Sequence, residues 1–327
     1  AIHNISMSKM NFILTEMTFL RYYIPLIIEA NSRDIICRVF VRPNNKYNNP
    51  LKYKGLLRSL SGKYNFNLYD CSELQNYFGT TFLVEGCGRE LLNAEKHKSL
   101  SLTYMTDFSV LYKNYINDVD HVIFPSKFWA EYYKQLSDKN LYLGSPKYDI
   151  DINVASVLKK YNLSKNKKAL VLAPRIRDMG KINLQNIYNI LIEKGYEVLV
   201  KTRGKDKLLE NLHGTRYFED ESWFPHTSLE LMKVSDFVIN FDSTAIKECV
   251  MSRTPVINYN IKPFEQPLKF LYEYDYCINL NEKIVYTNLY NHIDNISNIT
   301  NEDFSDAIQN HLFENNASNS ILNYLEK

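Results

Sequence analysis

The stretch DFVINFDSTAIKE, residues 236–248, shows how this chain folds. An apolar run over 237–241 predicts a buried strand, which leads through Asp242, Ser243 and Thr244 into a segment with helical spacing. A strand that turns directly into a helix is the repeating unit of a parallel sheet covered by helices. The stretch therefore predicts an α/β fold.

The same alternation continues in both directions along the chain. On the N-terminal side, strands are expected at 10–15, 35–42, 66–70, 80–84, 100–104, 120–124 and from residue 141. A second series of strands is expected from residue 169 and at 196–201, 215–218, 237–241, 255–259 and 276–280. Between these strands, helices are expected at 183–194, 227–235 and 244–252.

The length of the chain favours two domains, because 327 residues exceed the usual ceiling for a single core. We expect an N-terminal Rossmann-like domain over 1–150, a polar linker over 151–168 and a C-terminal Rossmann-like domain over 169–327, facing each other across a cleft. The tail, 286–325, is expected to form helices that could pack on either domain, and it is assigned to the second.

Composition narrows the choice of partners. The net charge is only +2, so no global positive field indicates nucleic acid, and an anion would have to bind at a local basic cluster. The five cysteines are widely spaced, odd in number and without a CxxC pair, which argues against disulfides and zinc and fits a reducing cytoplasm. No apolar run reaches the roughly 18 residues of a membrane span, and the first ten residues lack the order of a signal peptide.

The segment after strand 237–241 is the sharpest candidate site, because ligands of open α/β sheets gather at the carboxyl ends of strands. A helix beginning there offers free N–H groups, to which Ser243 and Thr244 add hydroxyls, so the turn could bind phosphate. Glu248 lies one turn further on, where it could accept hydrogen bonds from a ribose diol. The alternative is that Asp242 or Ser243 simply caps the helix and that Glu248 is a surface acid.

Two neighbouring strand ends carry basic groups. Arg175 and Arg177 lie in the loop 173–181, and Lys201 and Arg203 follow the next strand. Arginine can grip a pyrophosphate by two parallel hydrogen bonds and lysine as a point charge, although each loop alone could be an ordinary solvated surface. Their repeated position at strand ends favours one shared anion site.

The loop 219–227 also precedes a helix at this edge. It contains His226, a further candidate for the site, and two aromatic residues, Trp223 and Phe224. An aromatic ring here could flank a nucleobase, although core packing is the commoner role.

Three acids of the first half follow predicted strands and are candidates for a general base. They are Glu16, Glu85 and Asp107. None has a recognisable partner in the sequence, so no choice between them is made. The motifs GxGxxG, GxxxxGK[ST], HExxH and GxSxG are absent, which disfavours dehydrogenases, P-loop kinases, zinc proteases and esterases.

Two segments resemble a known family. Residues 143–149, LGSPKYD, are similar to the G-x-P-[KR]-x-D segment that closes the N-terminal domain of bacterial GT-B enzymes of envelope and capsule polysaccharide synthesis. Residues 235–256, SDFVINFDSTAIKECVMSRTPV, resemble their donor-site segment, which also occurs in CDP-glycerol glycerophosphotransferase-like proteins and UDP-N-acetylglucosamine 2-epimerases. The likeness extends over about half of the chain. Arg203-Gly204 replaces the His-Pro of the glycerophosphotransferases and Asp-Ser-Thr-Ala replaces the glycine-rich turn of the epimerases, which favours a sugar transferase.

The resemblance implies a metal-independent glycosyltransferase with the GT-B fold, in which Ser243 and Thr244 contact the donor diphosphate and Glu248 the ribose. The donor would be a nucleotide-activated sugar that acts as substrate, with no further cofactor, and the acceptor a glycan or a lipid-linked glycan. The basic segment from Lys46 to Lys63 is the candidate for peripheral contact with the inner membrane face. Two alternatives stay open: a glycerophosphotransferase or 2-epimerase on the same fold, and a non-catalytic protein that binds a glycan or a partner.

Overall fold

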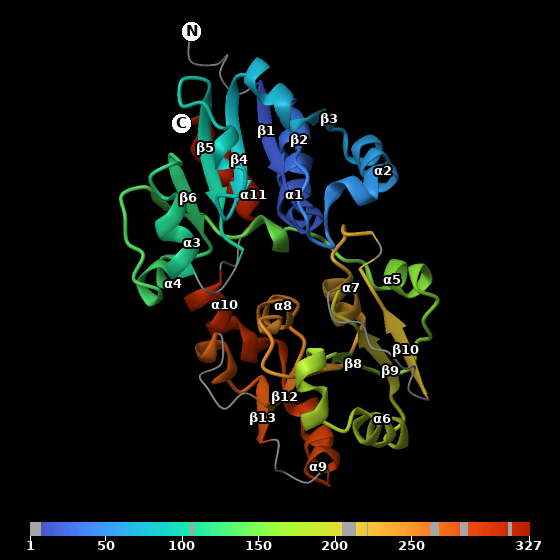
Figure 1. Cartoon of the computed structure of the whole chain (residues 1–327). Coiled ribbons are helices and arrows are strands. Elements are labelled where there is room, and N and C mark those ends of the chain that lie inside the picture. The colour runs from blue at the N-terminus through green and yellow to red at the C-terminus, as the bar shows by residue number, and fades with distance from the viewer. Residues whose placement is uncertain are drawn as a thin grey trace. The chain divides into compact units, whose positions relative to one another are not determined.

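The computed structural model describes residues 8–104, 108–204, 214–220, 222–261, 268–281, 287–312 and 316–327. The chain divides into two compact units, which are drawn in Figure 1. Unit 1 consists of Ala1–Ile150 together with Asn310–Lys327, and unit 2 is Asp151–Gln309. The end of the tail is thus part of unit 1, whereas the sequence assigned it to the second domain.

Unit 1 is built around a seven-stranded parallel sheet with the strand order β3-β2-β1-β4-β5-β6-β7. After their first residue, β1 and β4 are buried throughout, as expected for strands that helices cover on both faces. The strands are β1 Lys9–Leu14, β2 Ile36–Val41, β3 Asn67–Asp70, β4 Gly79–Val84, β5 His97–Leu102, β6 His121–Phe124 and β7 Asn140–Tyr142.

Helix α11 explains why the tail belongs to unit 1. It contacts α1, and its first N–H groups, those of Ala317 and Ser318, donate to the carboxylate of Asp149 at 3.0 and 2.7 Å. Asp149 closes the segment LGSPKYD, so this segment holds the tail helix in place. The helices of unit 1 are α1 Leu20–Ser32, α2 Lys54–Tyr64, α3 Phe108–Tyr115, α4 Lys127–Tyr132 and α11 Ala317–Glu326.

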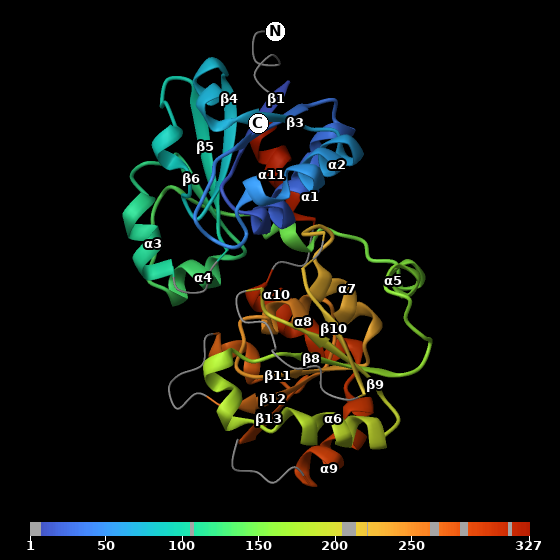
Figure 2. The ribbon, with the colours of Figure 1, turned by 45° about the vertical axis from the view of Figure 1, so that its right-hand side comes forward.

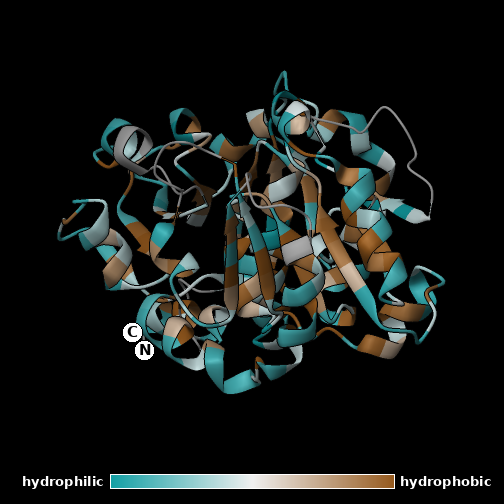
Figure 3. Ribbon diagram, turned by 90° about the horizontal axis from the view of Figure 1, so that it is seen from below, coloured by the Kyte–Doolittle hydropathy of each residue, from teal (hydrophilic) through white to brown (hydrophobic). Residues whose placement is uncertain are grey.

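Unit 2 has a six-stranded parallel sheet with the order β10-β9-β8-β11-β12-β13. Figure 3, coloured by hydropathy, shows hydrophobic residues along the strands of the molecule. The strands are β8 Lys168–Leu172, β9 Glu197–Lys201, β10 Thr215–Phe218, β11 Phe237–Asn240, β12 Val256–Asn260 and β13 Cys277–Asn281.

The helices of unit 2 cover both faces of this sheet, with α6 and α9 on one face and α7 and α8 on the other (Figures 1 and 2). Ile187 and Leu191 of α6 are fully buried in the core formed with the strands. Helix α5 lies within the stretch expected to be a linker, where Asn153 caps it and Lys160 pairs with Glu230 of α7 at 3.0 Å. The helices are α5 Val154–Lys160, α6 Leu184–Glu193, α7 Thr227–Val234, α8 Ile246–Met251, α9 Thr287–Asn295 and α10 Ser305–His311.

Each sheet reverses its strand order beside its first strand. In unit 1 the reversal lies between β1 and β4, and in unit 2 it lies between β8 and β11. The crevice at the carboxyl ends of two such strands is where open α/β sheets bind ligands. The segments that follow these four strands are therefore the places to examine for a site.

Candidate functional site

The carboxyl ends of β8, β9 and β11 in unit 2 enclose a small hollow of about 20 Å³. Three of the predicted donor-binding residues, Arg175, Arg203 and Ser243, line it. They come from the segments after three different strands, so the fold brings together side chains that are far apart in the sequence. The other lining residues are Leu172, Ala173, Pro174, Asp178 and Phe241.

The two arginines of the loop after β8, both predicted to bind the donor, lie in different environments. Arg175 precedes a 3₁₀ turn over Ile176–Lys181 and faces the hollow, whereas the Arg177 side chain is 66% exposed and does not line it. Asp178, which the sequence analysis overlooked, also lines the hollow, and its carboxylate lies 3.5 Å from the Lys181 ammonium. Its position three residues after Arg175, in the segment RIRDMG, was the available signal.

Lys201 occupies a different place from the one expected. Its ammonium lies 3.4 Å from the Asp220 carboxylate, donates to the Thr202 carbonyl at 2.7 Å, and is buried. Residues 201 and 203 would point to the same face in a continuing strand, but β9 ends at Lys201, so the two side chains need not share an environment. Only Arg203 of this pair lines the hollow.

The turn after β11 differs in detail from the predicted cap. Helix α8 begins at Ile246, and the Ser243 hydroxyl accepts a hydrogen bond from the Ala245 N–H at 3.1 Å. Asp242 is fully buried and turns its carboxylate toward β12 rather than toward the helix. Thr244 is exposed, and Glu248, expected as a ribose ligand or a surface acid, is buried on α8.

The loop before α7 contributes to the core. Trp223 and Phe224 are 1% and 5% exposed, so packing is their observed role. His226 is buried at the residue that precedes α7, and it makes no side-chain cap of that helix.

In unit 1, two of the three candidate bases follow the two strands that flank the order reversal. Glu16 follows β1, where its carboxylate accepts hydrogen bonds from Lys46 at 2.7 Å and Asn48 at 3.0 Å. Glu85 follows β4, is 5% exposed, and accepts a hydrogen bond from the Tyr104 N–H. The third candidate, Asp107, lies outside the described residues.

The turn after β4 packs very tightly. Gly86 has φ +64°, and a Cβ there would lie 2.3 Å from Cγ of Tyr115, so a larger residue has no room. Burial, together with the smaller effect of the negative charges of Glu16 and Glu85, raises the pKa of the adjacent Cys87 thiol to about 11. Glu16 and Glu85 therefore both lie close enough to the Cys87 thiol, beside β1 and β4, to affect its pKa.

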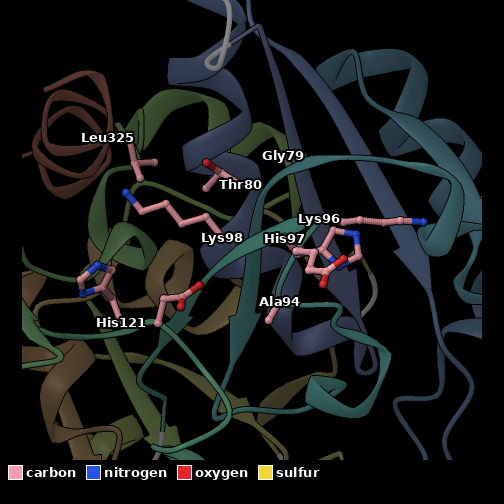
Figure 4. Close-up of a pocket in the computed structure, with 10 residues that line it drawn as sticks. Gly79, Thr80, Ala94, Lys96, His97, Lys98, His121 and Leu325 are labelled. Atoms are coloured by element: carbon pink, nitrogen blue, oxygen red, sulfur yellow. The ribbon is translucent and has the colours of Figure 1, made fainter. Parts of the chain in front are cut away.

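A much larger hollow, about 550 Å³, lies elsewhere in unit 1 (Figure 4). It is formed at the amino ends of β4, β5 and β6, with Lys98, Asp120, His121 and Leu325 of α11 among its lining. This is the edge opposite to the one where α/β sheets bind ligands, and its lysines are matched by Glu95 and Asp120. We therefore do not assign the site there. Within the described ranges, no group of three or more His, Cys, Asp or Glu side chains could hold a metal ion.

No protein-family model and no curated protein matches the sequence. Solved structures nevertheless share its fold. The UDP-GlcNAc 2-epimerase from Neisseria meningitidis bound to UDP-GlcNAc matches with a TM-score of 0.63 and 11% identity, over 97% of this chain and 99% of that one. The wall teichoic acid polymerase TagF matches with a TM-score of 0.63 and 14% identity, over 99% and 88%.

A glycosyltransferase, SnogD from Streptomyces nogalater, matches with a TM-score of 0.62 and 8% identity, over 98% of this chain and all of that one. At such identities the likeness concerns the fold. Its extent, across both units, confirms the architecture that the sequence predicted: the chain has two α/β domains of the GT-B type.

Proposed function

We propose that this protein is a glycosyltransferase that moves a sugar from a nucleotide-activated donor to a glycan or lipid-linked acceptor in surface polysaccharide synthesis. The observation that carries the proposal is the convergence of Arg175, Arg203 and Ser243 on one hollow at the order reversal of unit 2. Two guanidinium groups and a hydroxyl at this edge suit the phosphates of a nucleotide.

In the proposed reaction an acceptor hydroxyl attacks the anomeric carbon of the donor. The bond from that carbon to the phosphate oxygen breaks, and the nucleotide leaves with the electron pair. Arg175 and Arg203 stabilise the charge that develops on the leaving phosphate, so the donor serves as substrate and the chemistry requires neither a metal nor a cofactor. Lys201, Thr244, His226 and Glu248 remain proposed contacts of the donor, although they do not line the hollow, whereas Arg177 is proposed not to contact it.

The acceptor proton goes to a carboxylate of unit 1, for which Glu16, Glu85 and Asp107 are the candidates. Glu16 is the best placed of the two described acids, because its side chain is 15% exposed at the end of β1, whereas Glu85 is in the core. Hydrogen bonding to Glu16 raises the pKa of Lys46, so the Lys46 ammonium keeps its charge beside the Glu16 carboxylate.

Nucleotide binding is tested first, by thermal shift and calorimetry with UDP, CDP, UDP-GlcNAc and CDP-glycerol. A donor present at about 100 times its Kd should stabilise the protein by about 2.7 kcal/mol. Arg175→Ala should weaken nucleotide binding by about 10- to 100-fold, because it removes a charge-assisted contact with the phosphates. Arg177→Ala is the matched control, since that residue is in the same loop but outside the hollow. Equal affinities in the two variants, or no nucleotide binding at all, would contradict the proposal.

A second candidate activity follows from the fold shared with TagF and the 2-epimerase. A glycerophosphotransferase or an epimerase would use the same phosphate site. Product analysis after incubation with UDP-GlcNAc and CDP-glycerol distinguishes the three reactions, because the epimerase changes the sugar without an acceptor. Turnover of any donor also excludes a purely binding role.

We also propose that α2 contacts an anionic lipid surface on the cytoplasmic side. No acid occurs between Asp34 and Asp70, and Lys52, Lys54, Arg58 and Lys63 are exposed around α2. Each such cation near an anionic membrane contributes about 1 kcal/mol. In the described ranges no helix is both long and apolar enough to cross a bilayer.

Co-sedimentation with vesicles of phosphatidylcholine, with and without phosphatidylserine, tests this contact. Binding should require the anionic lipid and be lost in Lys54→Glu/Arg58→Glu, whereas Lys233→Glu, an exposed lysine of unit 2, should behave as wild type. Retention of the double variant on the vesicles would show that α2 is not the contact.

A further inference from the structure

Three neighbouring strands of unit 2 carry the same pair of residues at positions that lie side by side in the sheet. Ile-Asn occurs at 239–240 in β11, 257–258 in β12 and 278–279 in β13. The register places Asn240 opposite Asn258 and Asn258 opposite Asn279, so the three amides form a ladder across the sheet. Asn240 Nδ2 donates to Asn258 Oδ1 at 3.2 Å, and Asn258 Nδ2 donates to Asn279 Oδ1 at 3.3 Å.

The ladder holds Asp242, the residue before Ser243. The Asp242 N–H donates to Asn258 Oδ1 at 2.9 Å, and Asn258 Nδ2 donates to the Asp242 carboxylate at 2.9 Å. The Ile261 N–H donates to the other carboxylate oxygen at 2.8 Å. These bonds fix Asp242 with φ +53°, a conformation that a residue with a side chain rarely adopts, and they compensate for burying its charge.

Tyr272 is hydrogen-bonded to Ser243, the residue that follows Asp242. Its hydroxyl donates to the Ser243 carbonyl and accepts a hydrogen bond from Asn240 Nδ2 at 2.8 Å. Its own carbonyl accepts from Asn279 Nδ2 at 2.8 Å, which ties the tyrosine to the ladder. Burial raises the pKa of Tyr272 well above its ordinary value, so the phenol keeps the proton that it donates.

Neither Tyr272 nor Asn258 lines the hollow, yet both are bonded to the backbone that presents Ser243 to it. We infer that Tyr272, supported by the asparagine ladder, is a positioning residue for donor binding: it holds the Ser243 turn so that the serine hydroxyl faces the phosphates. The inference rests on the proposed function, because it concerns the same nucleotide site.

Tyr272→Phe tests the inference, with Tyr276→Phe as its matched control. The Tyr276 hydroxyl is also buried and donates to a backbone carbonyl, that of Leu271, but it does not reach the Ser243 turn. Tyr272→Phe loses two buried hydrogen bonds and Tyr276→Phe loses one, so both should lower the melting temperature, Tyr272→Phe by the larger amount. Nucleotide affinity, measured by calorimetry with the donor that wild type binds, should fall about three- to tenfold in Tyr272→Phe alone.

A double-mutant cycle adds a measurement that a purely structural role does not affect. If Tyr272 acts by placing Ser243, then Tyr272→Phe should cost no further affinity once Ser243→Ala has removed the hydroxyl. Additive losses, or equal nucleotide affinity in the two tyrosine variants, would overturn the inference while leaving the nucleotide site intact. If the wild type binds no nucleotide, the proposed function is refuted, and the inference about Tyr272 is refuted with it.

Discussion

At the residue scale, burial determines how the cysteines react. All five are free, and Cys37, Cys249 and Cys277 are buried. Burial raises the pKa of Cys37 and of Cys277 to about 12, and that of Cys87 to about 11. Because the thiolate is the reactive form, about one Cys87 thiol in a thousand is ionised at pH 8.

We therefore predict a single fast-reacting thiol in the native protein at pH 8, that of the partly exposed Cys71. Ellman's reagent should show one rapid equivalent, which Cys71→Ser removes. The reactivity of Cys87 should rise only as the pH approaches 11. A second rapid equivalent at pH 8 would show that the turn after β4 opens in solution.

The choice of base is also a question of single residues. Glu16→Gln should lower kcat by about 100-fold or more, because it removes the proposed proton acceptor but keeps the shape of the side chain. Nucleotide affinity should be unchanged, since the proposed phosphate site is in unit 2. The comparison is Glu85→Gln: a larger loss of kcat there, without a loss of folding, would move the role to Glu85.

At the scale of elements, α2 carries two glycines whose absent side chains would meet nothing. A Cβ at Gly55 or Gly62 has no neighbouring atom within 4 Å. Gly55→Ala and Gly62→Ala should each raise the free energy of unfolding by about 0.5–1 kcal/mol, because alanine favours the helix. Gly86→Ala is the contrast, since its Cβ would clash with Tyr115, and it should destabilise. Urea unfolding measures all three, and a loss of stability at Gly55 would mean that the face of α2 is covered.

The amino end of β5 is fixed by a histidine. His97 Nδ1 accepts from the Asn93 N–H at 3.0 Å, and its Nε2 lies 2.9 Å from the Tyr77 carbonyl. Burial lowers the pKa of His97 below 6.5, although the hydrogen bonds to the Tyr77 and Leu74 carbonyls partly oppose this. The unfolded chain therefore binds a proton more readily than the folded one, and stability is lost as the pH falls below 6.5.

We predict that the melting temperature of the wild type drops between pH 7.5 and pH 5, and that His97→Gln reduces this drop. Part of the dependence should persist, because burial also lowers the pKa of His311. A variant with the full wild-type dependence would show that His97 does not couple folding to pH.

Strands were the elements that the sequence predicted best, because buried parallel strands are short apolar runs that end at polar residues. Predicted strand 215–218 coincides with β10, and 196–201 differs from β9 by one residue. Helix α5 was missed because it is only seven residues long and buries only Val157, which is too little for an apolar pattern to show in the sequence. Its contact with α7 includes the ion pair of Lys160 with Glu230. Strand ends also indicated Arg175, Arg203 and Ser243, which the structure places around one hollow, while their role in donor binding stays a prediction. The burial of Lys201 could not be predicted, because it depends on the contact with Asp220 in another segment.

At the scale of the whole molecule, Asp149 links the end of the first run of strands to the tail. Its carboxylate accepts from the first two N–H groups of α11 and from the Ser318 hydroxyl at 2.6 Å. Asp149→Ala should lower the free energy of unfolding by about 1–2 kcal/mol, the usual cost of losing a helix cap. Asp151→Ala, an exposed acid two residues further on, should cost little. Equal effects in urea unfolding would refute the role of Asp149.

Unit 1 is assembled from two separate lengths of polypeptide, with all of unit 2 inserted between them. A protease that cuts once, between residues 150 and 151, would therefore leave two fragments that stay associated, because the second still carries α11 packed on α1 of the first. Only residues 151–309 form a unit without a break, so a recombinant fragment meant to represent unit 1 has to join Ile150 to Asn310 through a short artificial loop.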